Sequence, residues 1–392
     1  VSDYQYLEDF GETSDERSEN LLKSTAYVEQ PFSRSLLTVA GAHFKTLETR
    51  SNDAIFQYYP HATFFTEYIP LFGKRLYTDV FSDFSNFYRE EGDTYGRLSI
   101  EPRLRLPMSW NGLNFLFTGS LYEKAYLVDY DAEREDTETK NRETAKFEGD
   151  ANIQLTRNYD IGFLNLGAVR SLIKPQLKYT FISNTSYRDI PEIDPYDRVG
   201  RANSITYSLN HYLHALSPAG SAELSTLEIS QTYGLSEDLE YSDAYVGYGN
   251  RFSDVSAKFR LNLPRHFSFY NETALNVHGG GLSTIRNVLV HSIPNLYSMS
   301  VDHTYTKDYT SQVDFYFGAK YKYVTGRYEI RYSFRDKDWI DTVYQLIYQP
   351  KCWAVILTLS QTKRPRDTSI TVSFDLTGIT SRIDSPDRFL RR

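Results

Sequence analysis

Apolar and polar residues alternate with a period of two along most of this chain, and the last hairpin shows the pattern most clearly. Every second residue of the segment 369–377 is apolar: Ile370, Val372, Phe374 and Leu376. The preceding segment has a similar apolar face: Trp353, Val355, Leu357 and Leu359. Because successive residues of a β-strand point to opposite faces, the pattern predicts two strands that share one apolar face and one mostly polar face.

Segments of the same kind recur along the chain, for example at 255–262, 313–322 and 328–335. Alternating strands of about ten residues match the tilted strands of a transmembrane barrel. A β-sandwich could explain any one hairpin, but it explains poorly about twenty strands in succession with charged residues on their polar faces. We therefore predict an all-β fold, a large antiparallel transmembrane β-barrel of the outer membrane with about twenty strands in this chain.

Composition limits the other possibilities. The 392 residues show no shift in composition that would divide them into domains, and no run of 18 apolar residues that would form a helical membrane span. Tyrosine is abundant, with 33 residues, and its ring suits an interface between an apolar and a wet phase. The net charge of -8, without a basic cluster, argues against nucleic acid as a partner.

Residues that could carry chemistry are scattered. His211 and His214 are three apart on a predicted strand and therefore point to opposite faces, so they cannot bind one metal together. The glycine run 279–281 joins two strands and precedes no helix, which argues against a phosphate site. We expect no metal, no cofactor and no catalytic residue. A barrel hydrolase with Ser, His and Asp near one rim stays open as a less favoured alternative.

Cationic residues on the polar faces are predicted to line the barrel lumen: Lys258, Arg260, Lys320, Lys322, Arg331 and Arg335. They would lie beside acidic residues such as Asp314 and Glu329. One interpretation is that these charges only solvate a water-filled interior. The other is that they pair transiently with anionic groups on a transported molecule.

Several stretches of the chain resemble the lipopolysaccharide-assembly outer-membrane protein family (LptD, also called OstA or Imp). The matching stretches keep their order along the chain: 97–107, 172–179, 190–207, 351–355 and 374–379. The resemblance implies that residues 1–379 form the C-terminal part of a barrel whose first strands are missing, and that 380–392 form a tail. The family's periplasmic N-terminal domain is missing as well.

The resemblance also implies a function, which is transport without a reaction. Lipopolysaccharide would be inserted into the outer leaflet through the lumen and through a lateral gate beside the last strand. Ile370, Val372, Phe374 and Leu376 would then belong to one lip of that gate. The implied partners are lipopolysaccharide as cargo, a plug lipoprotein in the lumen and periplasmic bridge proteins that act through the missing domain. A general porin or uptake channel remains the main alternative.

Two further expectations rest on the resemblance. The family usually has a cysteine pair where this chain has Cys352 alone, so Cys352 is a disulfide candidate whose partner lies outside the chain. The irregular loop 186–203 carries Asp197, Arg198 and Asn203, which could hold the loop through local hydrogen bonds. Alternatively, this loop folds into the lumen against the plug or the cargo. Both interpretations stay open.

Overall fold

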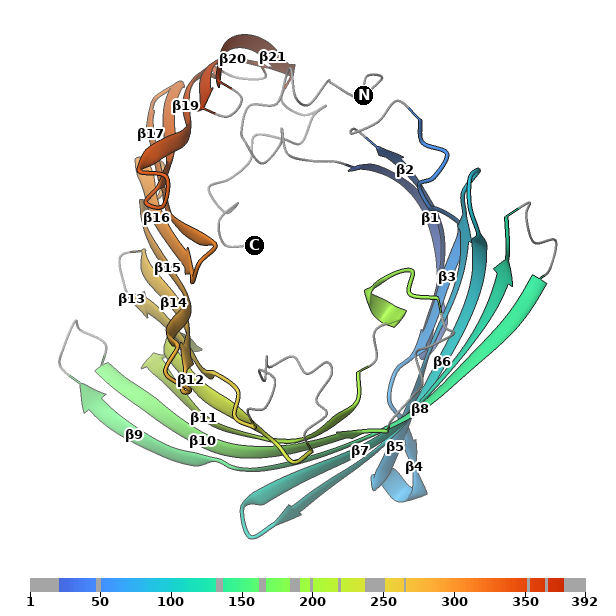
Figure 1. The fold of residues 1–392 in the computed structure, drawn as a ribbon. Helices are drawn as coiled ribbons and strands as arrows, with labels where there is room; N and C mark the ends of the chain where they lie inside the picture. The colour runs from blue at the N-terminus through green and yellow to red at the C-terminus, as the bar shows by residue number, and fades with distance from the viewer. Residues whose placement is uncertain are drawn as a thin grey trace.

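The fold is a single antiparallel sheet that curls into a ring (Figure 1). The structure, a computed structural model, describes residues 21–46, 51–131, 137–161, 167–183, 191–197, 200–217, 220–236, 251–263, 266–350, 353–363 and 366–376. The prediction of an all-β antiparallel architecture is confirmed. Among the described residues, no helix is long and apolar enough to cross a membrane.

Within the described residues the sheet contains 21 strands, each paired with a strand that is adjacent to it or next but one along the chain. The first part comprises β1 (Leu21–Pro31), β2 (Ser35–Thr46), β3 (Gln57–Thr66), β4 (Ile69–Leu71), β5 (Leu76–Tyr88), β6 (Thr94–Trp110), β7 (Leu113–Asp129), β8 (Thr137–Ile153), β9 (Leu155–Ile161), β10 (Gly167–Ile182) and β11 (Ala202–Ser217). The second part comprises β12 (Gly220–Gly234), β13 (Val255–Leu263), β14 (Phe267–Asn276), β15 (Gly281–Ile293), β16 (Tyr297–Thr306), β17 (Thr310–Tyr321), β18 (Val324–Ser333), β19 (Asp338–Tyr348), β20 (Trp353–Lys363) and β21 (Arg366–Leu376). Among the described residues, two short 3-10 helices lie in connections between strands, η1 (Phe72–Lys74) and η3 (Pro195–Asp197).

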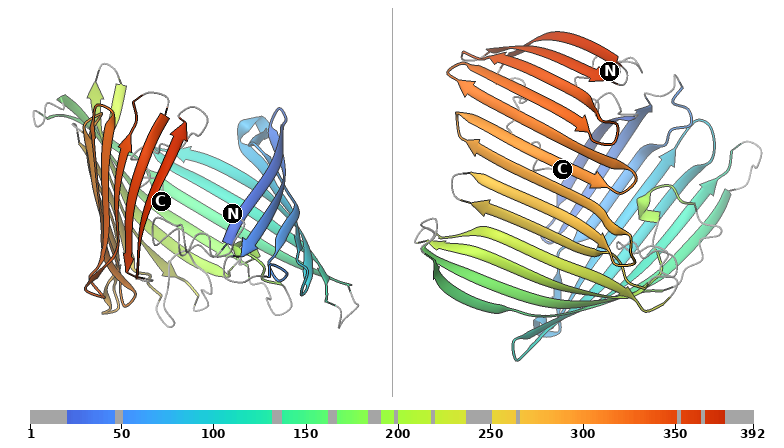
Figure 2. Two further views of the ribbon diagram at one scale, coloured as in Figure 1. Left: turned by 90° about the horizontal axis from the view of Figure 1, so that it is seen from above. Right: turned by 60° about the vertical axis from the view of Figure 1, so that its left-hand side comes forward.

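Two strands are continuations of their predecessors. β3 and β4 both pair with β5, and β8 and β9 both pair with β10. Each of these two pairs runs along one partner strand and counts as one crossing. The number of times that the chain crosses the sheet is therefore two less than the number of strands. The long strands β6, β7, β8 and β10 form the tilted, splayed wall seen in Figure 2.

The convex and concave faces of the sheet differ in polarity, as β6 illustrates. Leu98, Ile100 and Leu104 point outward and remain about half exposed, whereas Arg97 and Ser99 point inward and are buried. Across the described chain, buried positions are more often polar than apolar. The part of the chain that the structure describes therefore has no central apolar core, and its apolar surface is on the outside, as in a membrane barrel.

The two ends of the ring differ in their connections. The two longest connections in the sequence, 183–201 after β10 and 235–254 after β12, start from the same end of the ring, because β10 and β12 run in the same direction. The opposite end has tight turns, such as the pair Asn111 and Gly112 between β6 and β7, both with positive φ. We call these the long-connection end and the short-turn end.

The described sheet has two free edges. Backbone pairing within the described residues joins β1 only to β2, and β21 only to β20. Nearly every residue of β1 and most residues of β21 are exposed. The curl brings these edge strands to the same side of the ring, where Figure 1 shows the ring open between them.

Candidate functional site

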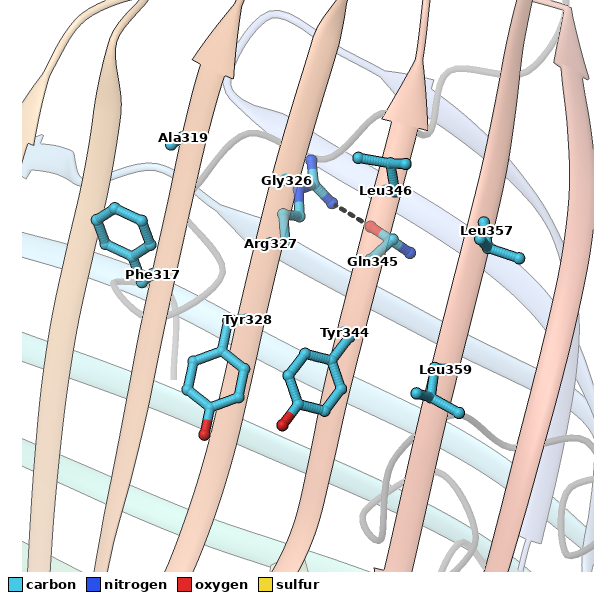
Figure 3. Close-up of a pocket in the computed structure, with 10 residues that line it drawn as sticks. All are labelled: Phe317, Ala319, Gly326, Arg327, Tyr328, Tyr344, Gln345, Leu346, Leu357 and Leu359. Carbon is cyan, nitrogen blue, oxygen red and sulfur yellow. Dashed lines mark hydrogen bonds between the residues drawn. The ribbon is translucent and has the colours of Figure 1, made fainter.

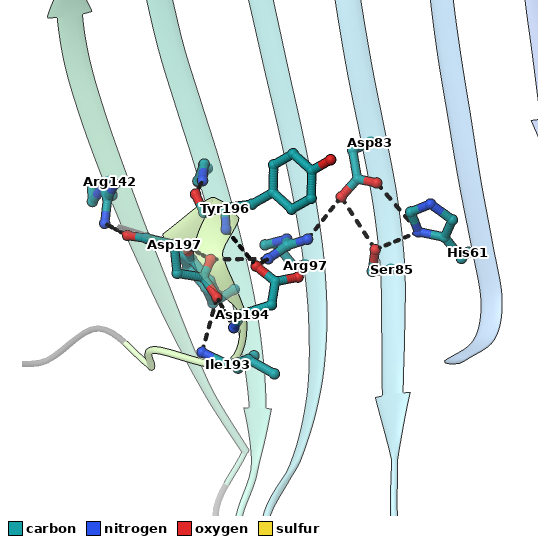
Figure 4. A network of polar contacts seen from close by, with 11 residues as sticks. His61, Asp83, Ser85, Arg97, Arg142, Ile193, Asp194, Tyr196 and Asp197 are labelled. Carbon is teal, nitrogen blue, oxygen red and sulfur yellow. Dashed lines mark hydrogen bonds and ion pairs between the residues drawn. The ribbon is translucent and has the colours of Figure 1, made fainter. Parts of the chain in front are cut away.

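A segment of the β10–β11 connection lies inside the ring, against the concave face of β5 to β8 (Figures 1 and 4). The described part of this segment, residues 191–197, ends in the 3-10 helix η3. We call residues 193–197 the inward loop. Its contacts with the wall lie near the long-connection end, because Arg97 is close to the start of β6.

Two aspartates shape the inward loop from within. The Asp197 carboxylate atom Oδ2 accepts hydrogen bonds from the backbone N–H groups of Ile193 and Asp194, at 3.0 and 3.2 Å. The Asp194 carboxylate accepts one from the N–H of Tyr196 at 2.9 Å. Aspartates commonly close turns by bonding nearby backbone N–H groups in this manner. The local hydrogen bonds expected for Asp197 are therefore present.

Arg97 of β6 joins the loop to the wall. Its Nη1 atom donates to Asp194 Oδ1 at 2.8 Å and to Asp197 Oδ1 at 3.0 Å, and its Nη2 atom donates to Asp83 Oδ1 of β5 at 3.1 Å. Only 2% of the arginine side chain is exposed. A planar guanidinium with several fixed donors suits three carboxylates better than the single ammonium of lysine.

Neighbouring strands add three more contacts to the inward loop. The Tyr126 hydroxyl of β7 donates to Asp197 Oδ1 at 2.7 Å, and Arg142 Nη1 of β8 donates to the Asp197 carbonyl at 2.6 Å. Lys124 Nζ donates to the carbonyl of Tyr196. The cluster contains three cations (Arg97, Lys124, Arg142) and three carboxylates (Asp83, Asp194, Asp197). Balanced charges and many hydrogen bonds are what a buried ionic cluster requires.

The environment of Asp197 favours its charged form. Burial alone raises the pKa of the carboxyl group, but the hydrogen bond from Tyr126, the charge of Arg97 and the two backbone N–H groups outweigh burial. Together they hold the pKa of Asp197 below its ordinary value of 3.8. The loop is therefore anchored by an ionised aspartate at neutral pH.

The cluster extends to β3 through His61, but the geometry does not match a hydrolytic triad. His61 Nδ1 contacts both Ser85 Oγ, at 2.8 Å, and Asp83 Oδ2, at 3.3 Å. A triad needs the serine and the carboxylate on different ring nitrogens. A second contact joins Ser171 Oγ to His211 Nε2 at 2.9 Å, and the described residues place no carboxylate against that ring. In the described chain, no group of three or more His, Cys, Asp or Glu side chains could hold a metal ion.

The other loop residues expected at this site have different positions. Arg198 lies outside the described residues. Asn203 is the second residue of β11, and its backbone carbonyl accepts a hydrogen bond from the N–H of Leu235 at 2.8 Å. Its side-chain oxygen is buried and has no hydrogen-bond partner among the described residues. The structure therefore brings Asp197 into the cluster and gives Asn203 a position at the start of a strand.

Four of the six predicted lumen cations belong to strands and share the concave face with acidic residues. Lys258 of β13 pairs with Glu272 at 3.1 Å, and Arg331 of β18 lies 3.3 Å from Asp314 and 3.9 Å from Asp341. Arg260 lies over the ring of Tyr270, 5.7 Å from its centre. Lys320 is exposed near the end of β17.

The prediction was wrong about the strand position of Lys322 and Arg335. Both lie in hairpin turns, because β17 ends at Tyr321 and β18 ends at Ser333. Lys322 has a positive φ of 53°, which belongs to a turn and not to an extended strand. Its Nζ atom lies 5.4 Å from the ring centre of Tyr321. Arg335 donates to the carbonyl of Tyr309 in the adjacent turn.

The four residues predicted for the gate strand all lie on the edge strand β21. Their side chains share the convex face, with exposed fractions of 72% for Ile370, 69% for Val372, 64% for Phe374 and 47% for Leu376. The ring of Phe374 stacks on that of Trp353, with ring centres 6.0 Å apart. Cys352 lies outside the described residues, so its expected disulfide stays a prediction.

The sequence did not single out the wall residues that receive the inward loop. Arg97, Lys124 and Arg142 come from three strands far from the loop in sequence. The available signal was the alternation itself, which places Arg97 on the polar face of β6 between outward-facing leucine and glycine. Alternation identifies an inward residue but not its partner across the ring.

Comparison with known proteins identifies the family of this chain. Residues 1–334 match the model of the family described as LptD, LPS transport system D. No curated protein matches the chain. Among solved structures, the siderophore receptor PirA from Acinetobacter baumannii is 8% identical with a TM-score of 0.42, and the match covers 90% of this chain and 70% of the receptor. A mutant of the ferric enterobactin receptor PfeA from Pseudomonas aeruginosa is 9% identical with a TM-score of 0.35, covering 87% and 72%.

The family match spans most of the chain and agrees with the resemblance drawn from its motifs. It also agrees with a sheet whose polar face is inside and whose apolar face is outside. The chain belongs to the LPS transport system D family and is a β-barrel protein of the bacterial outer membrane.

Proposed function

We propose that this chain forms the wall of a translocon that inserts lipopolysaccharide into the outer leaflet. In this proposal the sugar of the cargo passes through the polar lumen, and its lipid leaves through a lateral gate of which β21 is one lip. The family is a transport family, which supports transport without a chemical reaction. The proposed lateral gate rests on the edge strand β21.

The observation that carries the proposal is the free edge of β21. The strand pairs with β20 along its whole length, but its other side has no partner among the described strands. Unpaired backbone groups in a membrane cost several kcal/mol each, so such an edge needs a partner strand most of the time. A strand that pairs securely on one side and reversibly on the other is suited to form one lip of a gate.

Site-specific photocrosslinking in cells tests this proposal. A photoreactive residue replaces Val372 of β21, and newly made lipopolysaccharide is pulse-labelled before irradiation. A labelled adduct at position 372 is the expected result. The matched control replaces Leu104, which also faces outward near the middle of a strand but lies on β6. Equal early labelling at both positions would show that lipopolysaccharide reaches β21 only from the surrounding membrane.

The lumen charges supply a second test of the route. Lys258, Arg260 and Lys320 lie on the concave face and are exposed, so they can meet an anionic sugar. Replacing all three by glutamine should slow the appearance of lipopolysaccharide at the cell surface. Normal transport by a normally assembled triple variant would mean that these charges only solvate the lumen.

The proposed plug lipoprotein can be sought from the inward loop. The ring of Tyr196 is mostly exposed although its backbone is anchored. A crosslinker at position 196 should therefore capture the plug if the plug fills this part of the lumen. Absence of an adduct there, together with adducts at other lumen positions, would leave the loop with a role in the wall alone.

Cys352 is proposed to form a disulfide with a cysteine outside the chain, which would anchor the periplasmic domain through which the bridge proteins act. In the whole natural protein, Cys352 should resist alkylation until a reductant is added. Ready labelling without reductant would remove the anchor and leave the barrel assignment unchanged.

A further inference from the structure

An apolar groove of about 580 Å³ crosses the convex face of β17 to β20, close to the edge strand (Figure 3). Its size lies within the range of about 300–1,000 Å³ that is typical of ligand sites. Eight of the ten lining residues face outward, among them Ala319, Gly326, Leu346 and Leu357, and the other two, Arg327 and Gln345, alternate with them on their strands. The groove is therefore open to the membrane and not to the lumen.

Two small residues create the groove. Ala319 and Gly326 face each other in the register of β17 and β18, so no long side chain covers the sheet at that point. A Cβ atom built at Gly326 would meet no heavy atom within 4 Å. One side of the groove, next to Ala319 and Gly326, is formed by the aromatic residues Phe317, Tyr328 and Tyr344. The ring centres of the two tyrosines lie 5.0 Å apart. The groove is therefore the space left between the larger side chains of these strands.

A cation lies beyond the groove, toward the short-turn end. Tyr321 follows Ala319 on the same outward face, and the ammonium of Lys322 lies 5.4 Å from its ring centre. The lysine is therefore on the membrane side of the turn. Three residues of strand span about 10 Å, which places the ammonium within reach of a lipid headgroup whose chain occupies the groove.

The lengths of the connections indicate which leaflet is involved. Bacterial outer-membrane barrels have short turns on the periplasmic side and longer loops on the extracellular side. The β17–β18 turn belongs to the short-turn end, opposite the long connections 183–201 and 235–254. A lipid at this turn would therefore belong to the periplasmic leaflet.

We propose that the groove of β17 to β20 holds an acyl chain of an anionic phospholipid from the periplasmic leaflet, with its phosphate at Lys322. The occupant follows from the apolar lining, the membrane-facing position and the ammonium of Lys322 at the expected height. The bound chain reaches the strand next to β21, because Leu357 of the groove lining pairs in register with Val372. This inference requires the outer-membrane location but not the proposed gate.

Photocrosslinking with lipid tests the site. The whole natural protein, assembled with its partners, is placed in bilayers that contain phosphatidylglycerol with a photoreactive group in one acyl chain. Crosslinked peptides are mapped after irradiation. We expect adducts concentrated on β17 to β20, a several-fold loss in Gly326→Val, and a larger loss in Gly326→Leu. The Lys322→Gln variant should lose the preference for phosphatidylglycerol over phosphatidylcholine while it keeps the adduct position.

Gly119→Leu provides the matched control. Gly119 also faces outward, since it pairs with Leu104, and a Cβ atom there would meet no heavy atom within 4 Å. This variant should leave the adducts on β17 to β20 unchanged. Adducts spread evenly over the convex face, or unchanged in Gly326→Leu, would overturn the proposal. If Gly326→Leu fails to assemble, the smaller substitution Gly326→Val still tests the site. The proposed gate is tested separately, by measuring lipopolysaccharide transport.

Discussion

Arg97 and Asp197 form a buried ion pair at 3.0 Å although they are 100 residues apart in the sequence. One belongs to the wall strand β6 and the other to the inward loop. Removing one partner of a buried pair costs about 3–5 kcal/mol, because the remaining charge keeps its burial without compensation. The pair is therefore expected to contribute strongly to holding the loop against the wall, together with the contacts of Tyr126, Lys124 and Arg142.

The variant Arg97→Met should detach the inward loop. A loss of about 3 kcal/mol corresponds to a change of more than 100-fold in the docking equilibrium. Hydrogen exchange of the Ile193 and Asp194 amides, which donate to Asp197, should accelerate accordingly. The control is Arg103→Met, because Arg103 lies on the same face of β6 but pairs with Asp79 instead of the loop. Similar acceleration in both variants would assign the effect to the wall and not to the ion pair.

Docking of the inward loop should persist at neutral pH and be lost in acid. The folded pKa of Asp197 lies below the ordinary value of 3.8, so its contribution is present above that value. It disappears as the pH falls through the lower, folded pKa. Amide protection at Ile193, corrected for the intrinsic exchange rate at each pH, should follow this curve.

The variant Asp197→Asn should show reduced protection at neutral pH and a smaller acid step. Some protection should remain in this variant, because Asp194 and Asp83 still pair with Arg97. An acid step of unchanged size in this variant would show that Asp197 is not the group that titrates.

Among the lumen cations, Arg331 should matter more for stability than Lys258. Arg331 is mostly buried between Asp314 and Asp341, whereas the ion pair of Lys258 is about half exposed. An exposed pair contributes about 0–1 kcal/mol, whereas removing one partner of a buried pair costs about 3–5 kcal/mol. Arg331→Gln should therefore lower the midpoint of urea unfolding in lipid vesicles clearly, and Lys258→Gln only slightly. Equal shifts would contradict the assigned burial.

A charge on the convex face should be costly only where the membrane contacts it. Leu104→Lys places an ammonium near the middle of the lipid-facing surface, at a cost of about 2–4 kcal/mol. Thr118→Lys adds the same charge on the concave face, since Thr118 pairs with the inward Arg105. Comparing the unfolding free energies of the two variants in vesicles tests which face contacts lipid. Equal destabilisation of both variants would contradict the assignment of the convex face to the membrane.

The fold was largely predictable because period-two alternation is a local signal. In the final hairpin the register pairs Leu357 with Val372 and Leu359 with Ile370 on one face, as the alternation predicted. Strand ends were less predictable, because a polar residue such as Lys322 fits the alternation of a strand and equally well a turn. The left-handed backbone of Lys322 is set by the hairpin as a whole.

The candidate site was predictable only in part. Asp197 lies in a recognisable irregular loop, and its local hydrogen bonds involve neighbours in the sequence. Its partners Arg97, Tyr126 and Arg142 depend on how the sheet curls, which no short segment of sequence specifies. The groove has the same origin, since Ala319 and Gly326 become a gap only when β17 and β18 pair in this register.

The inward loop also limits the order in which the barrel can assemble. The chain enters the loop from β10, yet its ion pair is with β6, three hairpin connections earlier. Contacts between distant segments form late, because the chain between them must first be ordered. The cluster of Arg97 and Asp197 can therefore close only after β6 to β10 have paired and curved. A sheet with the wrong curvature would keep these charges apart, so closure of the cluster marks a correctly shaped wall.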